Sequence, residues 1–235
     1  MKHEVEAGTD AASLLLFDPL TLPDEFDAAN RDGDPTEILN DLHDQGRLFW
    51  INTGGDGGFL LHAFVDEEPN EDIRPYLRDP ETTEQFIVAS GRIFFMGAEY
   101  GYRNDDSQFK RYPGMGGSFP AENGTYTMTL YRTEYPDGIH EERFRQRSTR
   151  AQQLVHGTFS FLMAAAVLSV ITALIAFFIA SWATWFTYFL PAAALAILAP
   201  MLFSRLSVFQ SADTIWKAVN NELPSMVATL SRTAS

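Results

Sequence analysis

The sequence predicts a mainly β soluble domain of the α+β class, followed by a C-terminal transmembrane helical hairpin. The domain is expected to be an antiparallel sheet or small sandwich with one or two short helices. Two observations separate these parts: residues 151–204 contain no Asp, Glu, Lys or Arg, and the first 142 residues carry 29 of the 31 acidic residues. In addition, short apolar and aromatic runs in the first part alternate with Gly, Pro, Asp and Asn, as in strands joined by turns.

Residues 1–145 are expected to form one acidic cytosolic domain, because about 145 residues suffice for one compact core. The predicted strands are residues 13–17, 47–53, 59–65, 84–89, 92–96 and 125–131. The glycine-rich segment 54–58 predicts a hairpin between the second and third of these strands, and Ser90-Gly91 predicts one between the fourth and fifth. A helix is expected to begin at Pro35 with Asp34 as N-cap and to end near Gly46.

The uncharged run predicts two membrane spans within residues 146–204. A hydrocarbon core of about 30 Å needs roughly 20 helical residues, so this run is too long for one span. Small polar residues interrupt it near Trp182 and Trp185, two side chains typical of a membrane interface. We place the spans at about residues 159–180 and 186–203 and expect a continuous helix to lead from residue 139 into the first.

Charges that flank the spans predict their orientation. The flanking basic residues are Arg143, Arg145, Arg147, Arg150 and Arg205, whereas the loop between the spans has no charge. By the positive-inside rule, both termini are expected to be cytoplasmic in a multi-pass protein of the inner (plasma) membrane. The first residues lack a long apolar segment, which argues against a secretory signal.

Each predicted span carries small residues four positions apart. They are Ala165, Ser169 and Ala173 in the first span, and Ala192 and Ala196 in the second. Such stripes let helix backbones approach closely, either within one hairpin or between copies in a homo-oligomer. Because the spans contain no acid, lysine or arginine, proton or ion-coupled transport is not expected.

Residues 205–235 are predicted to form a cytosolic amphipathic tail. Ser211 is expected to cap a helix whose apolar face carries Ile215, Trp216 and Val219. Two placements are open for this tail: it lies on the membrane surface, or it docks onto the soluble domain.

Composition excludes several classes of function. The chain has no cysteine, which excludes disulfides, thiolate catalysis and Cys-ligated zinc. Its net charge of -14 disfavours nucleic acid as a partner, because phosphate contacts need clustered Lys and Arg. The loop 54–58 lacks the lysine of a P-loop, and the acidic clusters lack the ligand spacing of an EF-hand. No metal and no cofactor are therefore expected.

Few residues are candidates for catalysis. They are His62 in a predicted strand, Asp56 in the glycine-rich turn, and acids between Asp66 and Asp72. No HExxH or GxSxG pattern accompanies them. A non-enzymatic role is therefore favoured, and a membrane-proximal enzyme with a His/Asp/Glu site is the alternative.

Residues 97–120 are predicted to be a long loop that combines aromatic and basic side chains with five glycines. Its candidate binding residues are Tyr100, Tyr102, Arg103, Phe109, Arg111 and Tyr112. Large rigid side chains bury area at low entropic cost, so flexible glycine supports would make this loop a recognition surface. The alternative is that its aromatic residues pack beneath the sheet as core.

Together these features predict a membrane-tethered recognition or regulatory protein that binds a protein partner at the cytoplasmic face of the inner membrane. An immunity protein or a subunit of a defence or secretion assembly would have this layout. Besides the enzyme, a further alternative is an oligomeric pore or gate built from several hairpins. The expected partners are the lipid bilayer, a protein and further copies of the chain.

Overall fold

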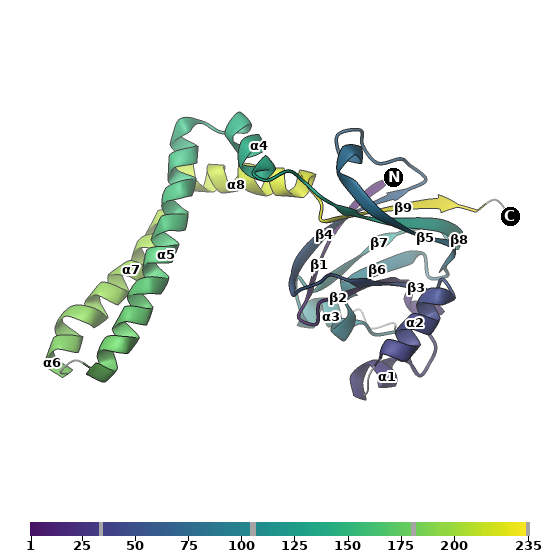
Figure 1. Cartoon of the computed structure of the whole chain (residues 1–235), viewed down its shortest axis with the longest axis horizontal. Helices are drawn as coiled ribbons and strands as arrows, with labels where there is room; N and C mark the ends of the chain where they lie inside the picture. The colour runs from purple at the N-terminus through teal and green to yellow at the C-terminus, as the bar shows by residue number, and fades with distance from the viewer. Residues whose placement is uncertain (33–34, 104–106, 180–181, 234–235) are drawn as a thin grey trace. The chain divides into compact units, whose positions relative to one another are not determined.

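The chain forms two compact units (Figure 1). The computed structural model describes residues 1–32, 35–103, 107–179 and 182–233. One unit comprises Met1–Pro136 with Leu223–Ser235, and the other comprises Asp137–Glu222. The first is an α+β domain with two sheets, and the second is helical. The α+β domain is therefore built from two stretches of chain that flank the helical unit in sequence.

The larger sheet has the strand order β1-β4-β9-β8-β5 within the described residues. These strands are β1 (Lys2–Thr9), β4 (Gly57–Val65), β5 (Leu77–Val88), β8 (Gly124–Thr133) and β9 (Met226–Arg232). The last strand in sequence lies in the middle of the sheet, parallel to β4 and antiparallel to β8 (Figure 1). The other neighbouring strands are antiparallel.

The smaller sheet is antiparallel and has the order β3-β2-β6-β7. Its strands are β2 (Ser13–Phe17), β3 (Leu48–Asn52), β6 (Arg92–Gly97) and β7 (Gly116–Pro120). Alternate residues of both sheets meet in one core, to which the smaller sheet contributes Leu16 and Phe95 and the larger sheet Met128 and Leu230. This arrangement is a sandwich, because each sheet buries one apolar face against the other.

Short helices cover the other face of the smaller sheet. Leu15 and Phe94 on this face pack in one cluster with Phe26 of α1 (Phe26–Asp32) and Leu39 of α2 (Thr36–Asp44). The helix predicted after Pro35 is thus present as α2, whereas its predicted N-cap, residue 34, lies outside the described residues. Three 3-10 turns, Pro19–Thr21, Arg74–Tyr76 and Ala98–Tyr100, and the short α3 (Ser107–Arg111) complete the described helices of this unit.

Both predicted hairpins are wrong, because each glycine-containing turn carries the chain from one sheet to the other. β3 and β4 lie in different sheets, as do β5 and β6. The buried Asp18 carboxylate holds the second crossing by accepting hydrogen bonds from the N–H groups of Ala89 (2.8 Å) and Ser90 (2.6 Å). Glycine permits a sharp turn but does not specify which strands the turn connects.

The six predicted strands are present, but β1, β7 and β9 were not predicted. β1 has the alternating pattern of a half-buried strand, with Val5 and Ala7 buried and Glu4 and Glu6 exposed. β7 occupies the last five residues of the segment 97–120, which was predicted to be a loop throughout. The glycine content of β7 concealed it, since glycine is depleted in strands.

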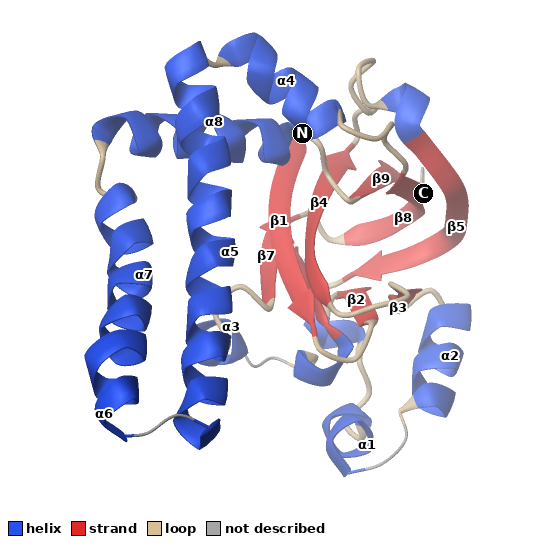
Figure 2. Ribbon diagram, turned by 60° about the vertical axis from the view of Figure 1, so that its left-hand side comes forward, coloured by secondary structure: helices blue, strands red, loops and turns tan. Residues whose placement is uncertain are grey.

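The helical unit consists of α4 (Ile139–Arg147), α5 (Arg150–Ile179), α6 (Trp182–Thr184), a π-helical turn (Trp185–Phe189), α7 (Leu190–Phe203) and α8 (Ser207–Glu222). Figure 2 shows α5 and α7 side by side. α5 and the helical stretch Trp185–Phe203 are long and apolar enough to cross a membrane. The pair is compatible with the predicted hairpin.

The helix predicted to continue from residue 139 into α5 is interrupted at Ser148, whose backbone is extended (φ -109°, ψ 150°). Thr149 then caps α5. Its N–H donates to Oε1 of Gln152 (2.8 Å), while the N–H of Gln152 donates to Oγ1 of Thr149 (3.3 Å). This reciprocal arrangement is a capping box. The prediction of a continuous helix is wrong, because the extended Ser148 and the Thr149–Gln152 cap end one helix and begin another.

The C-terminal segment differs from the predicted tail in two ways. α8 begins at Ser207, so Ser211 lies inside the helix, where its hydroxyl accepts a hydrogen bond from Nε2 of Gln152 (2.7 Å). After α8, residues 226–232 form β9, a strand of the larger sheet, instead of an amphipathic segment; this agrees with the alternative that the tail docks onto the soluble domain. Met226, Val227, Ala228 and Leu230 are all buried there, so burial against both neighbouring strands explains this placement.

Candidate functional site

The two catalytic candidates, His62 and Asp56, do not lie together. His62 is fully buried on β4, and its Nε2 lies 3.7 Å from Oε1 of Glu4 on the adjacent β1. Asp56 is exposed, and its Oδ1 accepts a hydrogen bond from the N–H of Ala12 (3.1 Å). Asp56 lies six positions before His62, and six steps of extended chain span about 20 Å. Asp56 thus holds the corner between β1 and β2.

The acids between residues 66 and 72 interact with neighbouring groups. Oδ1 of Asp66 accepts a hydrogen bond from the N–H of Arg232 (3.0 Å), and Glu68 lies 3.6 Å from the Arg74 guanidinium. Within the described ranges, no group of three or more His, Asp or Glu side chains is arranged to hold a metal ion. Asp66 thus serves as a long-range acceptor for the end of β9, and Glu68 forms a local ion pair.

Three of the six candidate binding residues brace their segment against the rest of the domain. The Phe109 ring lies 4.9 Å from that of Phe94, in the cluster beneath the smaller sheet. Arg103 forms an ion pair with Asp24. Tyr102 is half-buried, and the guanidinium carbon of Arg31 in α1 lies 5.8 Å from the centre of its ring. Phe109 therefore packs as core, as the alternative interpretation of this segment expected.

The other three candidates, Tyr100, Arg111 and Tyr112, form a connected group. Arg111 is exposed, whereas both tyrosines are half-buried and Tyr100 packs against the cluster beneath the smaller sheet. The rings of Tyr100 and Tyr112 are 4.7 Å apart, and the Arg111 guanidinium carbon lies 5.3 Å from the centre of the Tyr112 ring. The Tyr100 hydroxyl donates to Oδ2 of Asp10 (2.6 Å). We call these four residues, with the exposed Lys110 beside them, the tyrosine surface.

A carboxylate fixes the backbone beneath the tyrosine surface. Oε1 of Glu99 accepts a hydrogen bond from the N–H of Asp10 (2.6 Å), and Oε2 accepts one from the hydroxyl of Thr9 (3.1 Å). The hydrogen bond to Asp10 raises the pKa of Tyr100 to about 12, with burial as a smaller contribution. The hydrogen bond to Asp10 uses the Tyr100 hydroxyl hydrogen and holds the side chain in one position. Such preorganisation lowers the entropic cost of binding.

Glycines around the tyrosine surface allow close packing, in contrast to the predicted flexible supports. A Cβ on Gly97 would lie 2.6 Å from the carbonyl oxygen of Gly8, and a Cβ on Gly116 would lie 2.4 Å from Cβ of Met96. A Cβ on Gly117 would lie 2.7 Å from Cγ1 of Val5. These glycines bring β7 and the start of the segment against β1 and β6, so the surface rests on a rigid scaffold.

Two of the predicted membrane-interface arginines join α4 to α8. Arg147 donates through Nη1 and Nη2 to the two carboxylate oxygens of Glu222 (2.5 and 2.7 Å), and Arg143 lies 3.7 Å from the same carboxylate. The hydrogen bonds to Glu222 raise the pKa of Arg147. A bidentate pair of this kind fixes the relative position of the two helices more firmly than a single contact would.

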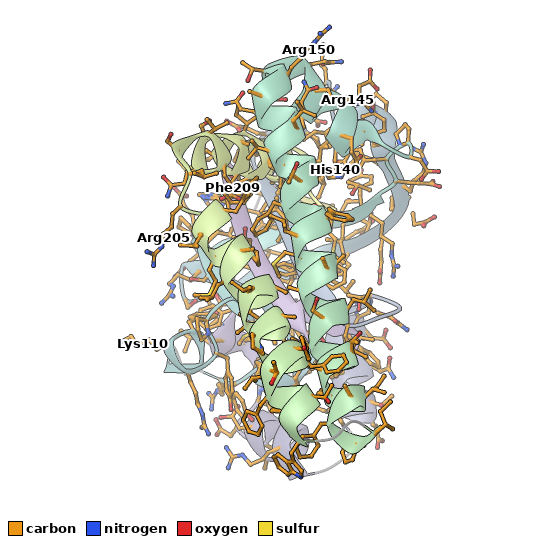
Figure 3. All side chains as sticks on the ribbon, turned by 90° about the vertical axis from the view of Figure 1, so that its left-hand side faces the viewer. Lys110, His140, Arg145, Arg150, Arg205 and Phe209 are labelled. Carbon is orange, nitrogen blue, oxygen red and sulfur yellow. The ribbon has the colours of Figure 1, made fainter. Side chains whose placement is uncertain are left out.

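The remaining interface arginines, Arg145, Arg150 and Arg205, are exposed. Figure 3 shows Arg150 at the start of α5 and Arg205 just beyond the end of α7. Because α5 and α7 run in opposite directions, these two positive charges flank the same end of the helix pair. Trp182 and Trp185 lie at the other end.

The two tryptophans have different environments. Trp185 is half-buried, and its Nε1–H donates to the carbonyl oxygen of Ala173 in α5 (2.7 Å). Trp182 is exposed, and its ring lies 5.4 Å from that of Phe177. Trp185 therefore joins α5 to the segment that leads into α7.

An aromatic cluster that the sequence did not predict connects three helices of this unit. His156 of α5 lies between Phe144 of α4 and Trp216 of α8, with ring-centre distances of 4.9 and 4.8 Å. Each of these residues was visible in the sequence, but nothing in their spacing indicated that they would meet. The break at Ser148 is what lets α4 and α5 share this cluster.

No protein-family model and no curated protein matches this chain. A solved structure described as "Crocagin biosynthetic gene J" is similar at 14% sequence identity, with a TM-score of 0.40. The similarity covers 60% of this chain and 81% of that one. At this level the likeness carries no argument about function.

Proposed function

We propose that this chain is a membrane-tethered recognition protein whose tyrosine surface binds a protein partner at the cytoplasmic face of the membrane. The preorganised group of Tyr100, Arg111 and Tyr112 is the observation that carries this proposal. Tyrosine and arginine are enriched among the residues that contribute most to protein interfaces, since they combine large apolar area with hydrogen bonding.

The exposure of large apolar side chains on α5 and α7 supports the membrane tether. Leu168, Phe178 and Leu195 are 65%, 82% and 68% exposed, whereas the residues buried within the pair include Ala166 and Ala193. In water, a helix pair with its large apolar residues outside would lose the free energy of burying them. In a bilayer the same arrangement is favourable.

Chain connectivity supports an even number of membrane crossings. β8 precedes the helical unit and β9 follows it, yet the two strands are paired in one sheet. Both ends of the helical unit must therefore return to the same domain, on one side of any membrane it crosses. Arg150 and Arg205 at one end of the helix pair favour the cytoplasmic side for that domain.

The recognition proposal is tested by capturing the partner from native membranes. A photocrosslinking residue at position 110 is expected to trap a specific protein, and Arg111→Ala or Tyr112→Ala is expected to weaken capture by about tenfold or more. Arg74→Ala, which removes an exposed arginine elsewhere on the domain, is the matched control. Equal capture by all variants, or no captured protein, would contradict the proposal.

The tether and its orientation are tested separately. The protein is expected to remain in the membrane pellet at alkaline pH, and release into the supernatant would contradict the tether. Because the chain has no cysteine, a single cysteine at position 184 gives an unambiguous label site. Labelling from outside the cytoplasm is expected, and labelling only from the cytoplasmic side would contradict the orientation.

A further inference from the structure

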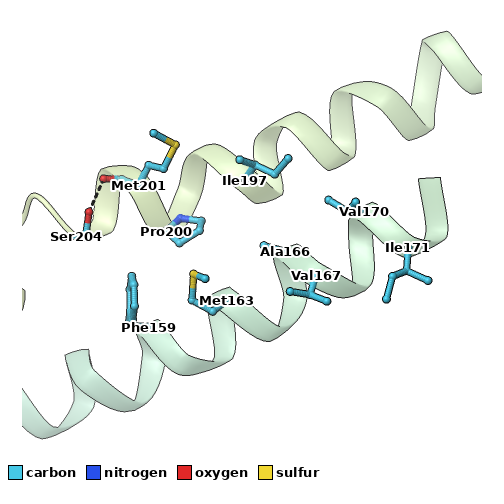
Figure 4. A pocket seen from close by; sticks show the side chains of 10 residues that line it. All are labelled: Phe159, Met163, Ala166, Val167, Val170, Ile171, Ile197, Pro200, Met201 and Ser204. Carbon is cyan, nitrogen blue, oxygen red and sulfur yellow. Dashed lines mark hydrogen bonds between the residues drawn. The ribbon is translucent and has the colours of Figure 1, made fainter. Parts of the chain in front are cut away.

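An open apolar groove with a volume of about 480 Å³ runs between α5 and α7 (Figure 4). Its walls include Phe159, Met163 and Val170 of α5 and Ile197 and Pro200 of α7. The two helices pack closely through small or compact residues, and their larger side chains form the rims of the groove. Apart from Ser204, which directly follows α7, the lining residues belong to the two helices proposed to cross the membrane.

The lining of the groove is suited to hydrocarbon. Ser204 at one end is the only lining residue with a polar side chain, and its hydroxyl already donates to the carbonyl oxygen of Met201 (2.8 Å; Figure 4). The lining side chains therefore have no hydroxyl hydrogen left to donate to a ligand. A polar ligand would lose its hydrogen bonds to water here without compensation.

The length of the groove matches one leaflet of a bilayer. On α5 the lining runs from Phe159 to Ile171, which is about 18 Å at 1.5 Å per residue. A whole hydrocarbon core is about 30 Å thick, so one leaflet contributes about 15 Å. A single acyl chain of one leaflet therefore fits the length of the groove.

Positive charge lies at the end of the groove where a lipid headgroup would sit. Arg205 directly follows the lining residue Ser204, is exposed, and has no ion-pair partner among the residues that the structure describes. No acidic residue occurs between residues 151 and 212, and Asp213 is paired with Lys217 (2.8 Å). An anionic headgroup at this end would meet attraction from Arg205 and no nearby unpaired acid.

We propose that this groove binds one acyl chain of an anionic phospholipid of the cytoplasmic leaflet, with the lipid phosphate at Arg205. This inference rests on the proposed membrane tether, because the groove meets lipid only if α5 and α7 lie in a bilayer. The lipid would fill the space between the helices and hold an anionic headgroup beside α8.

The test uses the full chain in nanodiscs of equal parts phosphatidylglycerol and phosphatidylcholine, released into the gas phase for native mass spectrometry. One retained phosphatidylglycerol per chain is expected. Val170→Trp, which fills the groove, is expected to lower retention by about tenfold, whereas Leu168→Trp on the exposed face of α5 should not. Arg205→Gln should abolish the preference for phosphatidylglycerol, and Arg150→Gln is the control for loss of one charge.

Each other outcome has a defined meaning. If no lipid is retained while the protein resists alkaline extraction, the lipid inference fails and the tether stands. If alkaline treatment releases the protein, both fail. A dimer that Val170→Trp dissociates would identify a second copy as the occupant, and equal retention of the two lipids would overturn the role of Arg205.

Discussion

The backbone N–H of Thr133 donates a hydrogen bond of 3.2 Å to the carbonyl oxygen of Ser225. Thr133 ends β8 before the helical unit, and Ser225 lies just before β9 beyond it. Ser225 in turn donates its N–H to the carbonyl oxygen of Leu60 on β4 (2.9 Å). The helical unit is therefore an insertion into the sheet, and the larger sheet acquires its central strand only after the chain has passed through that unit.

Leu230→Ala is expected to destabilise the α+β domain by about 2–5 kcal/mol, because Leu230 is fully buried in the core between the sheets. Ser231→Ala on the same strand is the control, since that side chain is exposed and should change stability by less than about 0.5 kcal/mol. Urea unfolding of the purified full chain, followed by tryptophan fluorescence and circular dichroism, measures both. Similar midpoints for the two variants would contradict a buried β9.

Ending the chain after Glu222 is expected to prevent cooperative folding of the α+β domain while leaving α5 and α7 intact. Without β9, strands β4 and β8 would each expose one row of backbone groups and the apolar residues that β9 covers. The effect is measured by comparing how fast a protease cleaves residues 1–136 in membranes that contain the truncated or the full chain. A truncated chain as resistant as the full one would show that β9 is dispensable.

Asp18→Ala is expected to destabilise the domain by on the order of 3 kcal/mol. The Asp18 carboxylate is fully buried and accepts hydrogen bonds from Leu20, Ala89 and Ser90, all of which would lose their acceptor. Ser90→Ala keeps these three N–H donors and removes only the Ser90 hydroxyl, which also donates to Oδ2 of Asp18 (2.9 Å), so it should cost less. Chemical denaturation of both variants provides the measurement, and equal losses would argue against Asp18 as the shared acceptor.

Tyr100 is expected to ionise at about pH 12, above the usual tyrosine pKa of 10.0, because its hydroxyl donates to Asp10. The raised pKa stabilises the folded state fully below pH 10.0, and this contribution is lost as pH rises through about 12. The difference in absorbance between the wild type and Tyr100→Phe, measured as a function of pH, isolates the ionisation of Tyr100. Asp10→Asn should move the pKa back toward 10.0, and an unchanged titration would contradict the hydrogen bond.

Burial lowers the pKa of His3 below its ordinary value of 6.5, and the His3 ring stacks on Phe119 at 5.6 Å. The neutral ring is favoured in the folded state, so its stabilising contribution is present above pH 6.5 and is lost as pH falls through the lowered pKa. His3→Phe keeps an aromatic ring on Phe119 without this proton uptake. Thermal unfolding at about pH 7.5 and about pH 5 should show a smaller acid loss for the variant.

Local patterns in the sequence were sufficient to predict most of the strands and the two apolar helices. Alternating or continuous apolar runs predicted β2, β3, β4, β6 and β8, because burial of one or both strand faces imposes such patterns locally. The uncharged segment 151–204 similarly predicted two long helices with apolar surfaces. These features depend on residues close together in sequence.

Partner choice among the strands was decided only by tertiary structure. The turns at residues 53–56 and 89–91 contain glycine, as hairpin turns do, yet they connect different sheets. Asp18 lies far from Ala89 in sequence, so its role in that crossing was not readable from the turn itself. The same applies to Tyr100 and Asp10, which meet because β1 and the segment after β6 are adjacent in space.

The sequence by itself determined that an acidic strand-rich part precedes two apolar helices, since composition and periodicity are local properties. Only the tertiary structure decided that residues 226–232 return to the centre of the larger sheet and that Tyr100, Arg111 and Tyr112 form one surface group. Hydrogen bonding and burial between distant segments select these arrangements, and their energies do not depend on any pattern within one segment.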